Sequence, residues 1–155
     1  MKIRAAFAAA CLAAAGCSTP SAYAPMRNYD GYDDTRLQEN VFTVSFAGNP
    51  FTSQQRALDF ALLRCAEVTL AGGFRYFTTA DIRQDMRTES YQTYNPASGG
   101  GRFRNYDSAT VVTSRPQSSL VIACHREKPA AAAGVVYDAA YLAESIREKY
   151  GLKAP

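Results

Sequence analysis

The sequence has little of the chemistry on which most enzymes and metal sites depend. Its 155 residues include no tryptophan, a single histidine (His125) and four scattered cysteines. It has no zinc-ligand spacing, no local Ser-His-Asp pattern and no dinucleotide-binding fingerprint. Cys124 lies beside His125, but adjacent strand residues point to opposite faces, which separates the two side chains. We therefore expect no enzyme, cofactor or metal site, and only paired catalytic carboxylates, which need no local motif, stay open.

Long hydrophobic runs are also missing. The longest run, Ala5 to Ala15, has eleven residues and follows Lys2 and Arg4. It is too short to span a bilayer, which takes about 20 apolar residues. A basic head followed by a short apolar run is typical of a secretory signal, which we assign to residues 1–16.

The end of this segment, Leu12 to Cys17, resembles the bacterial lipobox, in which small residues directly precede a cysteine. The resemblance implies that Cys17 becomes the first mature residue and carries a diacylglycerol. Ser18 stands where retention in the inner membrane favours Asp, so the analogy points to the periplasmic face of a Gram-negative outer membrane. The alternative is cleavage after Ala24, giving a soluble periplasmic protein, although Pro25 disfavours that site.

Once the signal is removed, the mature chain has almost equal numbers of basic and acidic residues. The whole chain has 17 basic and 14 acidic residues, and both basic residues of the signal leave with it, so the mature net charge is +1. This gives no electrostatic basis for binding nucleic acid. Cys65 and Cys124 remain in an oxidising compartment and are candidates for one disulfide; the alternative is two buried free thiols.

The mature chain predicts one small α+β domain at residues 35–152, behind a lipidated Cys17 and a flexible tether at 17–34. Alternation over 41–46 and 74–89 indicates strands, as do 110–113 and 119–125. Helical spacing begins at a capping box on Thr52 and stops at Gly72, and a second helix follows Asp138. We expect a mainly antiparallel sheet of three to four strands with two helices on one face, in the order β-α-β-β-α.

Two surfaces are candidates for recognition. The loop at 92–105 joins two long strands and is either a floppy hairpin tip or a partner-binding tip. The partner-binding candidates at this tip are Tyr94, Arg102, Phe103, Arg104 and Tyr106. The second surface is a ligand groove beside the expected helix start, where free N–H groups favour an anion. Its candidates are Tyr32, Arg36 and Thr52, which could instead anchor the chain as it enters the sheet.

Residues 31–77 resemble a family of small alphaproteobacterial lipoproteins of unassigned function. The pieces that carry the resemblance are Gly31-Tyr32, Arg36-Leu37, Glu39-Asn40, Val44-Ser45-Phe46, Gly48-Asn49, Thr52-Ser53, Ala66-Glu67 and Gly73-Phe74. The resemblance implies an address and a fold but no catalytic residue. We expect an outer-membrane lipoprotein that serves as a non-catalytic envelope interaction or structural module, held to the membrane by its lipid anchor and able to bind another envelope protein. The alternative is a periplasmic sensor or small-ligand binder.

Overall fold

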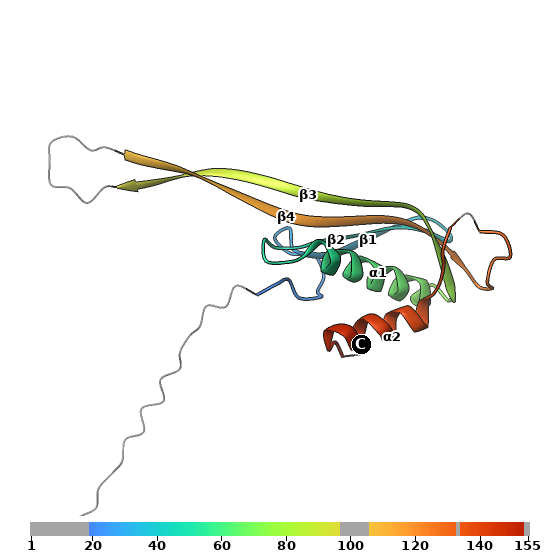
Figure 1. The fold of residues 1–155 in the computed structure, drawn as a ribbon. Coiled ribbons are helices and arrows are strands. Elements are labelled where there is room, and N and C mark those ends of the chain that lie inside the picture. Colours follow the sequence, from blue (N-terminus) through green and yellow to red (C-terminus); the bar gives the residue numbers. More distant parts are fainter. Residues whose placement is uncertain (1–18, 97–105, 133, 154–155) are drawn as a thin grey trace, which may run out of the picture.

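A five-stranded antiparallel sheet and two helices make up the protein (Figure 1). The computed structural model describes residues 19–96, 106–132 and 134–153. The strands lie in the order β1-β2-β4-β3-β5, and the sheet curls partly around α1. The elements are β1 (Gly31–Gln38), β2 (Val41–Ala47), α1 (Gln54–Ala71), β3 (Tyr76–Pro96), β4 (Tyr106–His125), β5 (Val136–Asp138) and α2 (Ala139–Tyr150).

The predicted fold class is wrong in its number and order of strands. The sheet has five strands instead of three to four, and the order is β-β-α-β-β-β-α instead of β-α-β-β-α. The prediction lacked β1, which is an edge strand with mostly exposed side chains, and β5, which has only three residues. Both are held by backbone pairing to a neighbouring strand, which leaves no hydrophobic alternation in the sequence.

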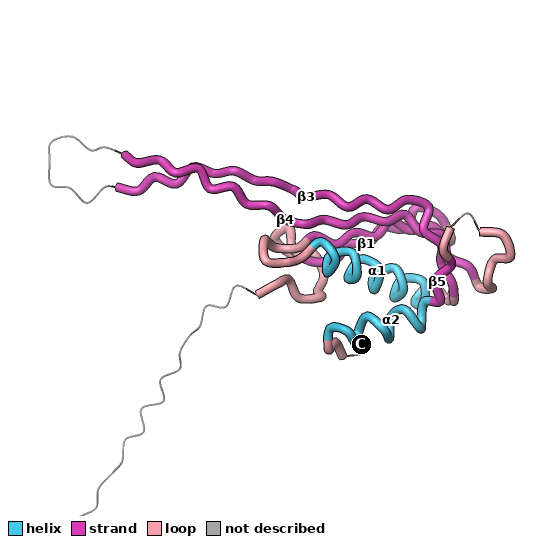
Figure 2. The backbone as a smooth tube through the Cα atoms, viewed as in Figure 1, coloured by secondary structure: helices cyan, strands magenta, loops and turns pink. Residues whose placement is uncertain are grey.

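The core lies between the sheet and α1. Phe42, Val44 and Phe46 of β2 point into it, as their alternation predicted, and so does Phe77 of β3. Phe60 of α1 is fully buried among three aromatic rings, with centroid distances of 5.2 Å to Phe46, 5.0 Å to Tyr150 and 5.4 Å to Tyr23. The second helix therefore covers α1 and adds a third layer to the domain (Figure 2).

The helix ends follow the sequence closely, with one change. Ser53, not Thr52, caps α1, because the Ser53 hydroxyl accepts from the N–H of Arg56. Gly72 and Gly73 end the helix as predicted, with Gly73 in the left-handed region at a φ of 77°. Asp138 caps α2 as predicted, and its carboxylate accepts from two backbone N–H groups of the first turn.

A β-bulge at Ala80 decides which side chains of β3 face the helices. Thr79 pairs with Ile122 and Asp81 pairs with Val121, so Ala80 has no partner. Before the bulge the odd-numbered residue Phe77 faces the core, whereas after it the even-numbered Ile82 shares a face with the buried Leu120. The sequence predicted one unbroken even face from Phe74 to Met86, which the bulge corrects.

The described part of the predicted tether is packed against the domain. Ser21 is buried, and its backbone N–H donates to the Thr52 hydroxyl at 2.8 Å. Its own hydroxyl accepts from the N–H of Asn49 at 2.7 Å. Residues 31–34 already belong to β1. Residues 19–34 therefore pack on the domain and do not form the predicted flexible tether.

Candidate functional site

The most distinctive surface is a two-stranded ribbon that extends from the sheet (Figure 1). We call residues 86–96 and 106–116 the ribbon. Its backbone pairs without interruption from Met86 opposite Pro116 to Pro96 opposite Tyr106, over eleven residue pairs. At 3.3 Å per residue the ribbon is about 36 Å long. The antiparallel pairing of these two segments was predicted, and the length of the strands required the hairpin either to bend or to protrude; the structure shows it protruding.

Within the described residues, no third strand pairs with the ribbon, and only at its root does Gly48 donate to the Pro116 carbonyl. β2 pairs with β4 only from Gln117 to Ala123, and β5 pairs with β3 only from Tyr76 to Thr78. Both ribbon strands therefore have an outer edge with no neighbouring strand, to which a strand of another chain could pair. A two-stranded ribbon in water gains little stability of its own, so its length is not explained by the folding of the domain.

The faces of the ribbon mix apolar and charged side chains. Tyr91 and Val112 are 55% and 63% exposed and lie on opposite faces, because Tyr91 pairs with Val111 and Ser90 pairs with Val112. On the Tyr91 face, Arg87 lies directly opposite Arg115, and Glu89 contacts both at 3.2 and 4.0 Å. These exposed ion pairs contribute little stability and keep the ribbon soluble.

The predicted partner-binding tip lies mostly outside the described residues. Arg102, Phe103 and Arg104 fall in the segment 97–105, which the structure does not describe. The backbones of Tyr94 and Tyr106 belong to the last pairs of the ribbon, opposite Ser108 and Pro96. The sequence reasoning missed Tyr91 and Val112, although two strands of matching length around one loop were a signal that the ribbon between loop and sheet is exposed on both faces.

The structure does not form the predicted ligand groove from Tyr32, Arg36 and Thr52. Thr52 is buried under Ser21, and Tyr32 lies partly buried under the Arg64 guanidinium, 4.5 Å from its ring centroid. Arg36 lies near the other end of β1, where it donates to backbone carbonyls of the β1–β2 turn. Ser21 and Tyr23 of the N-terminal segment therefore cover Thr52 and Tyr32. Arg36 lies apart from both, at the β1–β2 turn.

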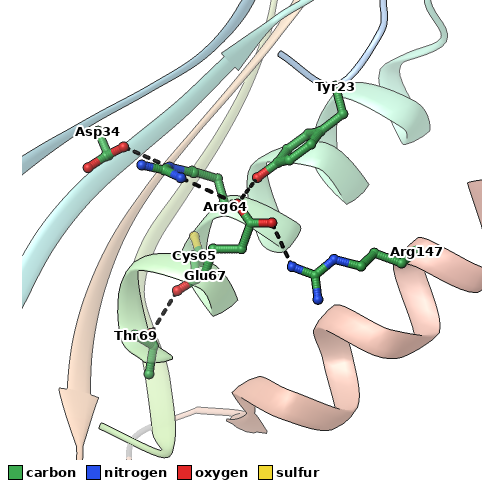
Figure 3. A network of polar contacts seen from close by, with 7 residues as sticks. All are labelled: Tyr23, Asp34, Arg64, Cys65, Glu67, Thr69 and Arg147. Carbon is green, nitrogen blue, oxygen red and sulfur yellow. Dashed lines mark hydrogen bonds and ion pairs between the residues drawn. The ribbon is translucent and has the colours of Figure 1, made fainter. Parts of the chain in front are cut away.

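A network of charged groups joins the N-terminal segment, the sheet and both helices (Figure 3). Glu67 of α1 accepts from the Tyr23 hydroxyl at 2.5 Å and from Arg147 of α2 at 2.7 Å. Arg64, one turn earlier, contacts Glu67 at 3.3 Å and Asp34 of β1 at 2.7 Å. Burial, and then the bond to Glu67, raises the pKa of Tyr23 well above its ordinary value. This network stabilises the fold and presents no free group to a substrate.

A second carboxylate, Asp59, joins the two helices. It is buried and accepts from Lys149 at 2.6 Å, Tyr150 at 2.7 Å and Gln55 at 2.8 Å. Burial alone would raise the pKa of Asp59, but the hydrogen bonds from these three partners outweigh it and hold the pKa below its ordinary value. An ionised, fully bonded carboxylate of this kind is a structural group.

The two candidate disulfide cysteines are buried free thiols in the structure. The Thr69 hydroxyl lies 3.3 Å from the sulfur of Cys124 and donates to the carbonyl of Cys65, so both cysteines border one patch of core. Burial raises the pKa of each thiol, which makes both poor nucleophiles. His125 points to the opposite face of β4, where its ring contacts Thr78 at 3.2 Å, as the alternation predicted.

A small cavity of about 90 Å³ lies where the ribbon leaves the sheet. Its lining includes Met26, Tyr29, Arg87, Arg115 and Gln117. Arg87 also stacks over the Tyr29 ring at 5.1 Å. Among the residues that the structure describes, no cluster of His, Cys, Asp and Glu could hold a metal ion.

A comparison with known protein families, curated proteins and solved structures gave no match. In the described ranges, neither helix has the length and apolar character that crossing a membrane requires.

Proposed function

We propose that this protein is a lipoprotein of the outer membrane, anchored through Cys17 on the periplasmic face, and that its domain is a non-catalytic interaction module. The proposed partner is another envelope protein, which binds the ribbon. The single observation that carries the interaction role is the ribbon itself, with eleven backbone pairs beyond the sheet and, in the described residues, no neighbouring strand on either side.

The ribbon fits protein recognition better than recognition of a small molecule. An open edge can accept a strand of a partner through main-chain hydrogen bonds, and exposed side chains on the faces then select the partner. Tyr91 and Val112 supply apolar contact area, while the ion-paired arginines and Glu89 supply a polar border. On the Tyr91 face, an exposed aromatic ring beside charged groups has the make-up of a binding interface, and Val112 adds apolar surface on the opposite face.

The membrane anchor is proposed from the sequence, since Cys17 lies outside the described residues. Its support is the basic head, the short apolar run and the lipobox-like residues before Cys17. The resemblance of residues 31–77 to small alphaproteobacterial lipoproteins agrees with this address. Replacing Cys17 by Ala should move the protein from the membrane fraction to the soluble fraction, and continued pelleting with membranes would contradict lipidation.

Photo-crosslinking in cells tests the interaction role. A photoreactive amino acid replaces Tyr91 or Val112 on the ribbon, and Tyr141 of α2, which is 75% exposed, serves as the matched control. We expect one discrete crosslinked protein from the ribbon positions and none from the control position. Equal crosslinking at all three positions, or none at the ribbon, would refute a role for the ribbon in partner binding.

Binding of a small ligand remains a second candidate because of the cavity at the root of the ribbon. Two arginines face it, and its volume of about 90 Å³ fits only a small anion such as carboxylate or phosphate. Addition of millimolar phosphate should raise the melting temperature if this cavity is a binding site, and Arg115→Ala should abolish that rise. A melting temperature that phosphate leaves unchanged would contradict this candidate.

A further inference from the structure

The docking of Thr19 and Ser21 onto the domain bears on how the protein sits on a membrane. Thr19 and Ser21 are held to the loop after β2 by hydrogen bonds. Asn49 donates to the Thr19 carbonyl at 2.9 Å and to the Ser21 hydroxyl at 2.7 Å, and Thr52 accepts from the Ser21 N–H at 2.8 Å. Two residues further on, the Tyr23 ring packs between Phe60 and Tyr32. The segment is therefore fixed to the domain from Thr19 onward.

This leaves almost no chain between the domain and the proposed anchor. Cys17 precedes Thr19 by two residues, which span at most about 7 Å. The headgroup layer of one leaflet is about 5–8 Å thick, from a total of 40–45 Å around a 30 Å hydrocarbon core. An acyl chain on Cys17 thus brings the Asn49 loop to the level of the lipid headgroups.

The chemistry of this end of the domain suits a lipid surface. Residues 17–26 and 47–55 contain no Asp, Glu, Lys or Arg. Phe51 lies at the tip of this loop with 56% of its surface exposed, and its N–H donates to the Asn49 side chain at 3.0 Å. An uncharged surface with a protruding aromatic ring can enter the headgroup region without the cost of dehydrating a charge.

The same loop touches the root of the ribbon. The N–H of Gly48 donates to the carbonyl of Pro116 at 2.8 Å, at the position where β4 leaves its pairing with β2. Figure 1 shows the ribbon and the start of the described chain at the same end of the domain, and Figure 2 shows β5 at the opposite end.

We infer that the loop around Phe51 rests on the lipid bilayer and that the ribbon runs from there along the membrane surface, because Arg87, Glu89 and Arg115 keep it out of the hydrocarbon. This inference rests on the proposed function, because it requires an acylated Cys17. It fixes the orientation of the domain: the end with Phe51 and the ribbon root faces the lipid, and the start of α2 faces away from it.

The absence of tryptophan makes the orientation measurable by fluorescence. F51W and Y141W each introduce one tryptophan, at exposed positions near opposite ends of the domain. The acylated proteins are reconstituted into vesicles of phosphatidylethanolamine and phosphatidylglycerol, with or without brominated acyl chains. We expect a blue-shifted emission that brominated lipid quenches at least twofold for F51W, and emission that lipid leaves unchanged for Y141W.

A spacer separates the effect of the short connection from any affinity of the loop itself. Ten Gly and Ser residues inserted between Ser18 and Thr19 should preserve flotation with vesicles and reduce the quenching of F51W to the level of Y141W. Quenching that survives the spacer, or acylated F51W that floats unquenched, overturns the inferred orientation and leaves the lipoprotein proposal standing. Mature protein that carries no acyl chain and does not float overturns the lipoprotein proposal, and this inference with it.

Discussion

The hydroxyl of Tyr23 should contribute measurably to stability, because it joins the N-terminal segment to the charged network on α1. Tyr23→Phe keeps the ring and its contacts with Phe60 and Tyr32 and removes only the hydrogen bond to Glu67. A hydrogen bond to a charged group contributes about 1.5–3 kcal/mol. Glu67 retains two arginine partners in the variant, so we expect a loss near the lower end, about 1–2 kcal/mol.

Urea denaturation of the non-acylated Cys17→Ser protein, followed by circular dichroism, measures this loss. In a domain of this size, 1 kcal/mol shifts the melting temperature by roughly 4 °C. Tyr29→Phe is the matched control, because Tyr29 is 67% exposed in the same segment. A Tyr23→Phe variant as stable as the parent within about 0.3 kcal/mol would show that the bond between Tyr23 and Glu67 contributes nothing to stability and would refute this prediction.

The pH dependence gives an independent check on the same residue. Burial and the bond to Glu67 raise the pKa of Tyr23 in the folded protein above its ordinary value of 10.0. A raised pKa contributes stability that is complete below pH 10 and is lost as the pH rises further, because the unfolded chain then releases the proton first. The difference between parent and Tyr23→Phe should therefore shrink above pH 10, and a constant difference would contradict the assigned shift.

Three further changes test other parts of the structure. Asp59→Asn should lower the free energy of unfolding by about 1–3 kcal/mol at pH 7. Because the pKa of Asp59 is lowered in the folded protein, this loss should fade as the pH falls below about 4. Denaturant titrations at several pH values that show a constant loss would contradict the lowered pKa. Replacing residues 88–114 by a two-residue Asn-Gly turn should change the free energy of unfolding by less than about 1 kcal/mol, because that part of the hairpin buries no core; a larger loss in urea titrations would show that it supports the fold. We also predict that an oxidising environment joins Cys65 to Cys124; non-reducing mass spectrometry of protein purified from the periplasm would find two free thiols if this is wrong.

The local signals in the sequence predicted local structure well. The alternation of Phe42, Val44 and Phe46 located a strand and its buried face, and the glycines after Ala71 located the end of a helix. The antiparallel pairing of the long hairpin was also predicted, although its strands run further, to Pro96 and from Tyr106, and β4 continues through Pro116 without the predicted break. These features depend on residues close together in the chain, which is why a single sequence contains them.

The features that the sequence did not predict depend on contacts between distant residues. β1 is held by its ladder to β2 and by Asp34 on Arg64, and neither leaves a periodic pattern in its residues. Helical spacing in α1 predicted an apolar stripe that does not include Phe60 and consists of Leu58, Ala61, Leu62, Cys65 and Val68. Phe60 is nevertheless buried, because the sheet covers α1 on one side and α2 covers it on another. The predicted groove failed for the same reason, since Ser21 reaches Thr52 across about thirty residues of chain.

The bulge at Ala80 has a consequence for how this protein can change in evolution. Side chains of a strand alternate between faces, so adding or removing one residue in a ribbon strand exchanges its two faces beyond that point, whereas adding or removing two preserves them. Paired changes of two residues per strand would lengthen or shorten the ribbon and leave Phe77 and Leu120 in the core. Homologues should accordingly differ in ribbon length by even steps, with one compensating bulge wherever an odd step occurs.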